Sequence, residues 1–128
     1  MKIASLMLFA AFALAPALAG ASPCAQATIE MMSLRDVRVE DCDALGPAHP
    51  DCIAQEDYEK GFLLSLLAHC PLQRPDCVRA GERYRLAWEQ RSYLCRSAGS
   101  SGAPDCVAAL QLEQGRLQPL VSCLVNGW

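Results

Sequence analysis

The chain has 128 residues and carries 11 basic against 14 acidic side chains, a formal net charge of −3. This acidic balance argues against nucleic-acid binding, which requires a basic surface. The length suits one small domain, and small domains bury only a modest fraction of their surface. Eight cysteines in so short a chain therefore indicate a framework of disulfide bonds.

The N-terminus has the parts of a secretory signal. Lys2 gives a positive start, residues 3–18 are almost entirely apolar, and small residues suitable for cleavage follow. We therefore predict that residues 1–21 are a signal peptide and that residues 22–128 form the mature domain. No later stretch approaches the roughly 20 apolar residues that a bilayer requires. We expect an exported protein, periplasmic or extracellular, with no transmembrane segment after signal cleavage.

The cysteines stand at alternating long and short intervals. The gaps between successive cysteines are 18, 10, 18, 7, 18, 11 and 17 residues. Eighteen residues are five turns of an α-helix, which return a side chain to the same face. We therefore predict an all-α fold of four helices, each with a cysteine near both ends, over residues 24–42, 52–70, 77–95 and 106–123.

A Pro-Asp-Cys motif precedes the last three of these helices. It stands at residues 50–52, 75–77 and 104–106, and a looser version, Ser-Pro-Cys, opens the first helix at residues 22–24. Aspartate and serine are preferred N-caps, and proline is favoured in the first helical turn. The motif thus predicts a helix start with cysteine at the first helical position and with these N-caps: Ser22, Asp51, Asp76 and Asp105.

The first two predicted helices differ in pattern. The first has the least regular helical pattern, because apolar and charged residues alternate in Val37-Arg38-Val39-Glu40 as they do in a short strand. We keep it helical because an equivalent helix recurs later in the chain. The second begins with Glu56, Asp57 and Glu59, which suit the positive end of the helix dipole. It is then nearly all apolar over residues 62–68, so we expect it to be the most buried helix.

The third and fourth predicted helices have clear apolar stripes. On the third, Glu82, Arg85 and Glu89 mark the opposite, solvated face. The stripe of the third helix consists of Cys77, Ala80, Gly81, Tyr84, Ala87, Trp88 and Cys95.

Gly61 of the second helix and Gly115 of the fourth occupy equivalent positions, where we predict close helix packing.

Helix length limits which cysteines can pair. An 18-residue helix is about 27 Å long, whereas the two Cα atoms of a disulfide lie within about 7 Å. Short loops make successive helices antiparallel. One end of the domain then holds four of the cysteines and the other end holds the remaining four, and each set allows three pairings. The first set is Cys24, Cys70, Cys77 and Cys123.

An internal duplication narrows the choice. The first four cysteines recur 53 or 54 residues later, and YEKGFLLSLLAHC at 58–70 parallels LEQGRLQPLVSC at 112–123. We interpret the chain as two tandem helical hairpins, 24–70 and 77–123, packed as a small four-helix domain. A pattern that crosses between hairpins, with Cys70–Cys77 and Cys24–Cys123, is an alternative. The pairs that we predict staple each hairpin at both ends: Cys24–Cys70, Cys42–Cys52, Cys77–Cys123 and Cys95–Cys106.

The sequence offers no catalytic constellation. His49 lies in a Pro-rich loop, and His69 stands beside Cys70 at a helix end. Adjacent helical residues point about 100° apart, and a bridged cysteine is not a nucleophile. Thiol-redox or metal chemistry is an alternative that requires free cysteines, and the sequence has no Cys-x-x-Cys pair. We expect no enzymatic activity, no cofactor and no metal.

Charge divides unevenly between the two halves. Residues 24–70 hold nine acids and three bases, whereas residues 71–128 hold five acids and seven bases. The arginines of the second half are candidates for a positive patch that binds an anionic partner. Arg79 and Arg83 are its tentative partner-binding residues, and the further candidates are Arg74, Arg91 and Arg96.

These features favour an exported, disulfide-stabilised binding protein without enzymatic activity. It would act as an inhibitor, an immunity-type protein or an envelope-interaction factor, with another protein or an envelope component as its partner. One alternative is a carrier of small apolar ligands; the other is the thiol-redox or metal-handling protein. The carrier would use a cavity among Phe62, Leu66, Trp88 and Leu117.

Overall fold

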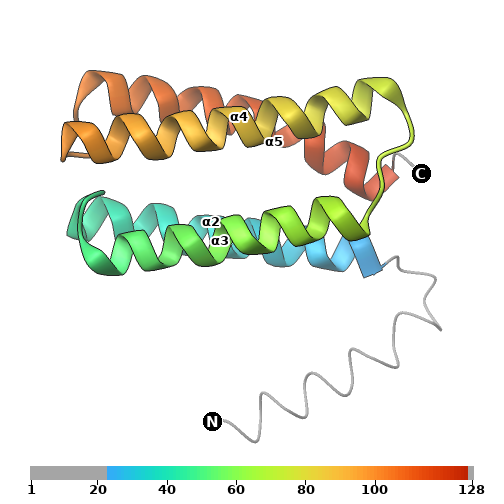
Figure 1. Cartoon of the computed structure of the whole chain (residues 1–128), viewed down its shortest axis with the longest axis horizontal. Coiled ribbons are helices and arrows are strands. Elements are labelled where there is room, and N and C mark those ends of the chain that lie inside the picture. The colour runs from blue at the N-terminus through green and yellow to red at the C-terminus, as the bar shows by residue number, and fades with distance from the viewer. Residues whose placement is uncertain (1–22, 127–128) are drawn as a thin grey trace, which may run out of the picture.

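The computed structural model describes residues 23–126, which form four helices joined by short loops. The helices are α2 (Pro23–Leu45), α3 (Pro50–His69), α4 (Pro75–Ala98) and α5 (Pro104–Asn126). Helices α2 and α3 form one antiparallel hairpin, α4 and α5 form a second, and the two hairpins lie side by side (Figure 1). The predicted fold class is confirmed. The predicted signal peptide, residues 1–21, lies outside the described residues.

The disulfides close each hairpin on itself. The four pairs are those that staple each hairpin at both ends, with Cα atoms 4.4–5.9 Å apart. All eight cysteines lie within residues 23–126 and none is free. The crossing alternative, Cys70–Cys77 with Cys24–Cys123, is therefore wrong. No disulfide joins the two hairpins. The linker of residues 71–74 is therefore their covalent connection, and their other contacts are non-covalent. The pairs are Cys24–Cys70, Cys42–Cys52, Cys77–Cys123 and Cys95–Cys106.

The last three helices begin two residues earlier than we predicted. Each starts at the proline of its Pro-Asp-Cys motif, because the fixed φ of proline and its missing N–H suit the first helical position. His49 is the N-cap of α3, and its Nδ1 atom accepts a hydrogen bond from the backbone N–H of Asp51 at 3.1 Å. The aspartates therefore lie inside the first turn, where their charge suits the helix dipole, and Ser22 lies outside the described residues. The prediction of aspartate N-caps was wrong for Asp51, Asp76 and Asp105.

The segment with strand-like alternation is helical. Within α2, Val37 is exposed whereas Arg38 is buried. Arg38 continues a buried stripe that recurs every three or four residues, as expected for a helix and not for a strand. The apparent alternation arose because a buried arginine took a place that apolar residues usually occupy. The stripe of α2 consists of Thr28, Met31, Arg35 and Arg38.

The duplication extends to the burial pattern. Adding 53 to the number of each buried residue of α2 gives a buried residue of α4. Adding 54 relates most of the buried positions of α3 and α5 in the same way. Each hairpin thus presents the same face to the other. The buried equivalents in α4 are Gly81, Tyr84, Trp88 and Arg91.

The equivalent glycines do not mark a close helix approach. Gly61 and Gly115 are exposed, and a Cβ atom added to either would meet no heavy atom within 4 Å. The prediction of tight packing there was wrong. The close approach is at Gly81, where an added Cβ would lie 3.2 Å from Cδ1 of Leu72 and 3.6 Å from Cδ2 of Leu67.

One apolar core lies toward the end of the molecule that holds Cys70. Its buried members come from all four helices, and they pack between the hairpins. No helix within residues 23–126 combines the length and apolar character needed to cross a membrane. The core residues are Met31, Leu63, Leu66, Cys70, Tyr84, Trp88, Leu117, Leu120 and Leu124.

Candidate functional site

Beside the apolar core, the interface between the hairpins buries six charges. The centre of this cluster is Glu113 of α5, whose side chain is fully buried. Its Oε1 atom accepts from Arg38 at 2.9 Å and from Arg91 at 3.1 Å, and its Oε2 atom accepts from Arg35 at 3.1 Å. One carboxylate therefore binds arginines from both hairpins. We call the buried charge cluster the set Arg35, Arg38, Glu56, Glu59, Arg91 and Glu113.

The other two glutamates of the cluster come from α3. Arg38 donates two hydrogen bonds to Glu59, at 2.9 and 3.1 Å. Arg91 donates to Glu56 at 2.6 Å, and Arg96 reaches Glu56 at 3.4 Å from a partly exposed position. Three arginines face three glutamates, so the cluster is electrically neutral. Such pairing is the condition under which ionised groups are tolerated in a protein interior.

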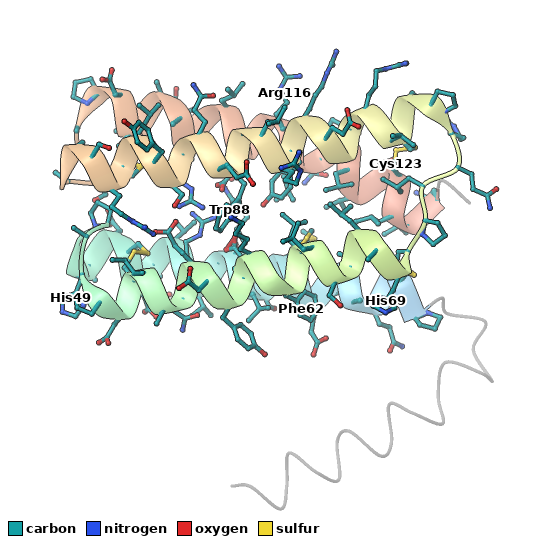
Figure 2. All side chains as sticks on the ribbon, in the orientation of Figure 1. His49, Phe62, His69, Trp88, Arg116 and Cys123 are labelled. Carbon is teal, nitrogen blue, oxygen red and sulfur yellow. A yellow bond between two sulfur atoms is a disulfide. The ribbon has the colours of Figure 1, made fainter. Side chains whose placement is uncertain are left out.

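Trp88 lies within the cluster, between the two hairpins (Figure 2). Its indole N–H donates to Glu59. The Cζ atom of Arg91 lies 4.6 Å from the ring centroid and that of Arg38 lies 5.9 Å from it, close enough for cation–π attraction. The indole thus satisfies its single donor while its faces meet two cations.

The cluster keeps Arg38 charged and the neighbouring Tyr84 neutral. Burial opposes the charge on Arg38, but Glu113 and Glu59 outweigh this effect and raise its pKa above the usual value. Burial also raises the pKa of Tyr84 above its usual value, and Glu113 and Glu59 add to the effect because they repel a phenolate. The carboxylates of Glu113 and Glu59 therefore raise the pKa of both Arg38 and Tyr84.

Two sequence-based interpretations are wrong here. Arg91 is a buried member of the cluster and not part of a surface patch, because it fills an α4 stripe position opposite Glu56 and Glu113. Glu56 and Glu59 are buried ion-pair partners, whereas the sequence pattern suggested a role at the helix start through the dipole. The internal duplication could have indicated the cluster, because Arg38 and Arg91 occupy equivalent positions on the buried stripes of α2 and α4.

Acid is expected to destabilise the fold through Glu56. Burial opposes its ionisation, but the Ser92 hydrogen bond and the charges of Arg91 and Arg96 outweigh this and lower the pKa of Glu56. A carboxyl with a lowered folded-state pKa stabilises the fold above its unfolded pKa, and this stability is lost as pH falls through the folded pKa. The free energy of unfolding should therefore be steady near pH 6–7 and fall below about pH 4.

Urea denaturation followed by circular dichroism between pH 7 and pH 2 measures this effect. A Glu56→Gln variant should be less stable at neutral pH and should lose less additional stability in acid. An unchanged acid dependence in that variant would show that Glu56 is not a source of it.

The two histidines lie apart, near opposite ends of α3 (Figure 2). The ring of His49 caps the start of this helix, while the exposed His69 places Nδ1 2.8 Å from the backbone oxygen of Ser65. Cys70 is bridged to Cys24. The arrangement therefore brings no thiol and imidazole together for nucleophilic chemistry.

The alternative of thiol or metal chemistry lacks the free cysteines that it requires. Among residues 23–126, Cys42, Cys52 and Glu56 bring two sulfur atoms and a carboxylate oxygen within 4.8 Å of one another. These two sulfurs are joined in a disulfide, and Glu56 is paired with arginines. Metal ligation by cysteine needs thiolates, so this group is a disulfide beside an ion pair.

The side chains of the proposed carrier cavity pack against one another. Leu66, Trp88 and Leu117 belong to the apolar core, and Phe62 is partly buried against it. Three surface hollows within residues 23–126 are each lined by other side chains and by none of these four. The four residues therefore serve as core packing.

A surface hollow between α4 and α5 contains both arginines that we predicted as partner-binding residues. It has a volume of about 490 Å³ and lies at the end of the hairpin closed by the Cys77–Cys123 disulfide. Arg79 and Arg83 line it from α4, and Arg116 lines it from α5. Figure 2 shows Arg116 on the side of this hairpin that faces away from the other hairpin. We call this feature the arginine hollow.

The arginine hollow has a cationic character that nothing within residues 23–126 neutralises. Arg74 also lines it, but Arg74 donates to Asp76 at 2.7 and 3.2 Å, so this pair is balanced. Arg79, Arg83 and Arg116 form no ion pair with any described residue, and the hollow includes no acid other than Asp76. Of the five arginines predicted for the patch, Arg74, Arg79 and Arg83 lie here, whereas Arg91 and Arg96 are directed to the buried charge cluster.

The rest of the surface divides by charge as the sequence suggested. Because the buried charge cluster is neutral, the uneven charge of the two halves resides on their surfaces. Outside the cluster, hairpin α2–α3 carries seven acidic side chains against Lys60, and hairpin α4–α5 carries six arginines against four acids. The arginine hollow is thus a cationic site on an acidic protein.

Comparison with known proteins returns no relative. No protein-family model, no curated protein and no solved structure matches this chain. The fold and its disulfides define the class to which it belongs, a four-helix domain made of two stapled hairpins.

Proposed function

We propose that the protein is an exported, non-enzymatic binding protein that acts in the periplasm or outside the cell and recognises an anionic partner through the arginine hollow. The observation that carries the proposal is the set of three arginines without ion-pair partners among the described residues, in one concave site. An inhibitor, an immunity-type protein and an envelope-interaction factor are the roles that such binding would serve.

Export is supported by the disulfides and by the signal-like N-terminus. Four bridges among eight cysteines are typical of proteins that mature in an oxidising compartment. The N-terminal pattern of a positive start followed by an apolar run leads to the same compartment.

The lack of enzymatic activity is supported by the placement of the reactive residue types. The cysteines are closed as disulfides, and the two histidines stand near opposite ends of one helix. The buried carboxylates accept hydrogen bonds from arginines, and Glu56, which lines a small hollow, does so as an ion-pair partner and not as a free acid or base. General acid–base catalysis needs such a group within hydrogen-bond reach of a substrate.

Binding is supported by rigidity as well as charge. Both helices that line the arginine hollow are tied together beside it by the Cys77–Cys123 disulfide and at the other end by Cys95–Cys106. Fixed side-chain attachment points reduce the entropy lost when a partner binds. A concentrated positive site also attracts an anionic partner over a distance of about one Debye length.

The test compares Arg79→Gln/Arg83→Gln with the unaltered exported protein in binding to poly-L-glutamate and to phosphatidylglycerol vesicles. We expect the unaltered protein to bind at least one probe and the double variant to bind it at least about tenfold more weakly, because each arginine near an anionic surface contributes about 1 kcal/mol.

Arg85→Gln is the matched control. Arg85 lies on α4 outside the hollow and pairs with Glu89 at 3.2 Å, so its loss should leave binding nearly unchanged. The proposal fails if the protein binds neither of these probes nor inorganic phosphate, or if the control loses as much affinity as the double variant.

A further inference from the structure

We infer that the arginine hollow is a phosphate site: its ligand is a phosphate group, carried by a lipid headgroup or by a small organophosphate. This inference rests on the proposed function and specifies the chemistry of the anion. It follows from the number, kind and placement of the donors that line the hollow.

The cationic donors come from two helices. Arg79 and Arg83 are four residues apart on α4, so they lie one above the other on one face of that helix. Arg116 belongs to α5, which forms the other wall. Each guanidinium offers a planar fork of N–H donors that matches phosphate oxygens in a bidentate manner. An anion between the walls can therefore accept hydrogen bonds from both helices.

Neutral donors complete the lining. Ser122 and Asn126 lie four residues apart on α5 and face the same hollow. A hydroxyl and an amide can each donate to an oxygen that the arginines leave uncovered. The nearby acid Asp76 does not repel an anion strongly, because Arg74 holds it in a two-bond ion pair.

The positive charge of the donor set exceeds what one carboxylate can compensate. A carboxylate has two oxygens and one charge, so it would leave part of three guanidinium groups uncompensated. A phosphate monoester has three terminal oxygens and a charge of about −1.5 to −2 at pH 7. It balances more of the positive charge and uses more of the donors.

The shape of the hollow favours a compact group over an extended acidic peptide. Its volume of about 490 Å³ lies within the range of roughly 300–1,000 Å³ that is typical of small-ligand sites. The site is bounded by two helices and by the Cys77–Cys123 bridge, whose residues are part of its lining. One phosphate with a short attached group fits such a site, whereas a peptide with several carboxylates needs a longer surface.

The experiment titrates the exported protein with inorganic phosphate and, at equal ionic strength, with acetate. Binding is followed by the chemical shifts of α4 and α5 amides and by the thermal midpoint, which rises when a ligand binds the folded state. We expect saturable shifts around the arginine hollow with phosphate and not with acetate.

Arginine-to-lysine variants separate hydrogen-bond geometry from charge. Arg79→Lys/Arg83→Lys keeps the charge but loses the fork, so its phosphate affinity should fall about tenfold or more. Arg85→Lys, outside the hollow, should bind phosphate as the unaltered protein does. Equal affinity in Arg79→Lys/Arg83→Lys would overturn the inference of a built phosphate site.

Two further probes distinguish the source of the phosphate. Tighter binding to phosphatidic acid vesicles than to glycerol phosphate would assign a lipid headgroup, and the reverse would assign a small organophosphate; both results support the inference. If poly-L-glutamate binds the hollow and phosphate does not, the phosphate inference fails while the proposed function stands. If phosphate, poly-L-glutamate and anionic vesicles all fail to bind, both fail.

Discussion

Replacing Glu113 by glutamine is expected to lower the free energy of unfolding by about 3–5 kcal/mol, the usual cost of leaving a buried charge without its partner. The carboxylate of Glu113 accepts hydrogen bonds from Arg35, Arg38 and Arg91. Glutamine removes its negative charge while three arginines stay buried. Urea denaturation with the disulfides intact, followed by circular dichroism, measures the loss.

Glu89→Gln is the matched control for this substitution. Glu89 is partly exposed and pairs with Arg85 of α4 at 3.2 Å and with Lys60 of α3 at 3.9 Å, and an exposed pair contributes about 0–1 kcal/mol. If the two variants lose the same stability, then Glu113 does not hold the hairpins together as described. The loss of stability in Glu113→Gln measures the cost of leaving buried arginines without a counter-charge. It does not measure the net contribution of the whole cluster, because replacing a whole buried ion cluster by apolar residues can leave the free energy of unfolding unchanged.

Removing the disulfide that closes the longer loop should cost more than removing the one that closes the shorter loop. The Cys24–Cys70 bridge spans 46 residues and the Cys42–Cys52 bridge spans 10. Loop-closure entropy in the unfolded chain then predicts losses of about 4 and about 2.7 kcal/mol. Denaturation of Cys24→Ala/Cys70→Ala and Cys42→Ala/Cys52→Ala, under conditions that keep the other bridges oxidised, gives both values.

The second hairpin provides an internal replicate for the disulfide prediction. Its bridges span 46 and 11 residues, almost the same lengths as in the first hairpin. The alanine variants of Cys77–Cys123 and Cys95–Cys106 should therefore reproduce the order of the losses. Equal losses for long and short loops in both hairpins would show that native-state contacts of the cysteines, and not chain entropy, set their effect.

The architecture could be predicted from the sequence because the spacing of the cysteines matches the helical period and because a disulfide limits the distance between two Cα atoms. Five helical turns separate Cys24 from Cys42, and a helix of that length keeps its own two cysteines from pairing. The duplication then favoured pairing within each hairpin. These constraints are geometric and local, so they did not depend on knowing how the hairpins pack.

The buried charge cluster could not be read in the same way. Helical periodicity places Arg38 and Arg91 on the buried stripes, but charged residues are rarely buried unless they are paired. Their partner Glu113 lies 75 residues from Arg38 along the chain. Only the packing of one hairpin on the other brings these groups together. The equivalence of Glu59 with Glu113 and of Arg38 with Arg91 was the available signal.

The contribution of α5 to the arginine hollow was also missed, although the disulfide prediction implied it. Grouping arginines by sequence neighbourhood selected those near α4 and omitted Arg116. In an antiparallel hairpin closed by Cys77–Cys123, a residue seven positions before Cys123 lies level with one seven positions after Cys77. That position is 84, next to Arg83, so Arg116 belongs beside the predicted residues.

The two long-loop disulfides also determine how the protein would respond to mechanical tension. A pulling force applied at Cys24 and Cys123 passes from Cys24 to Cys70 through one bridge and from Cys77 to Cys123 through the other. Only the seven residue steps between Cys70 and Cys77 can lengthen on this path, to at most about 25 Å at full extension. All four helices are bypassed by covalent bonds, so the domain would carry a load between two attachment points as a nearly inextensible link.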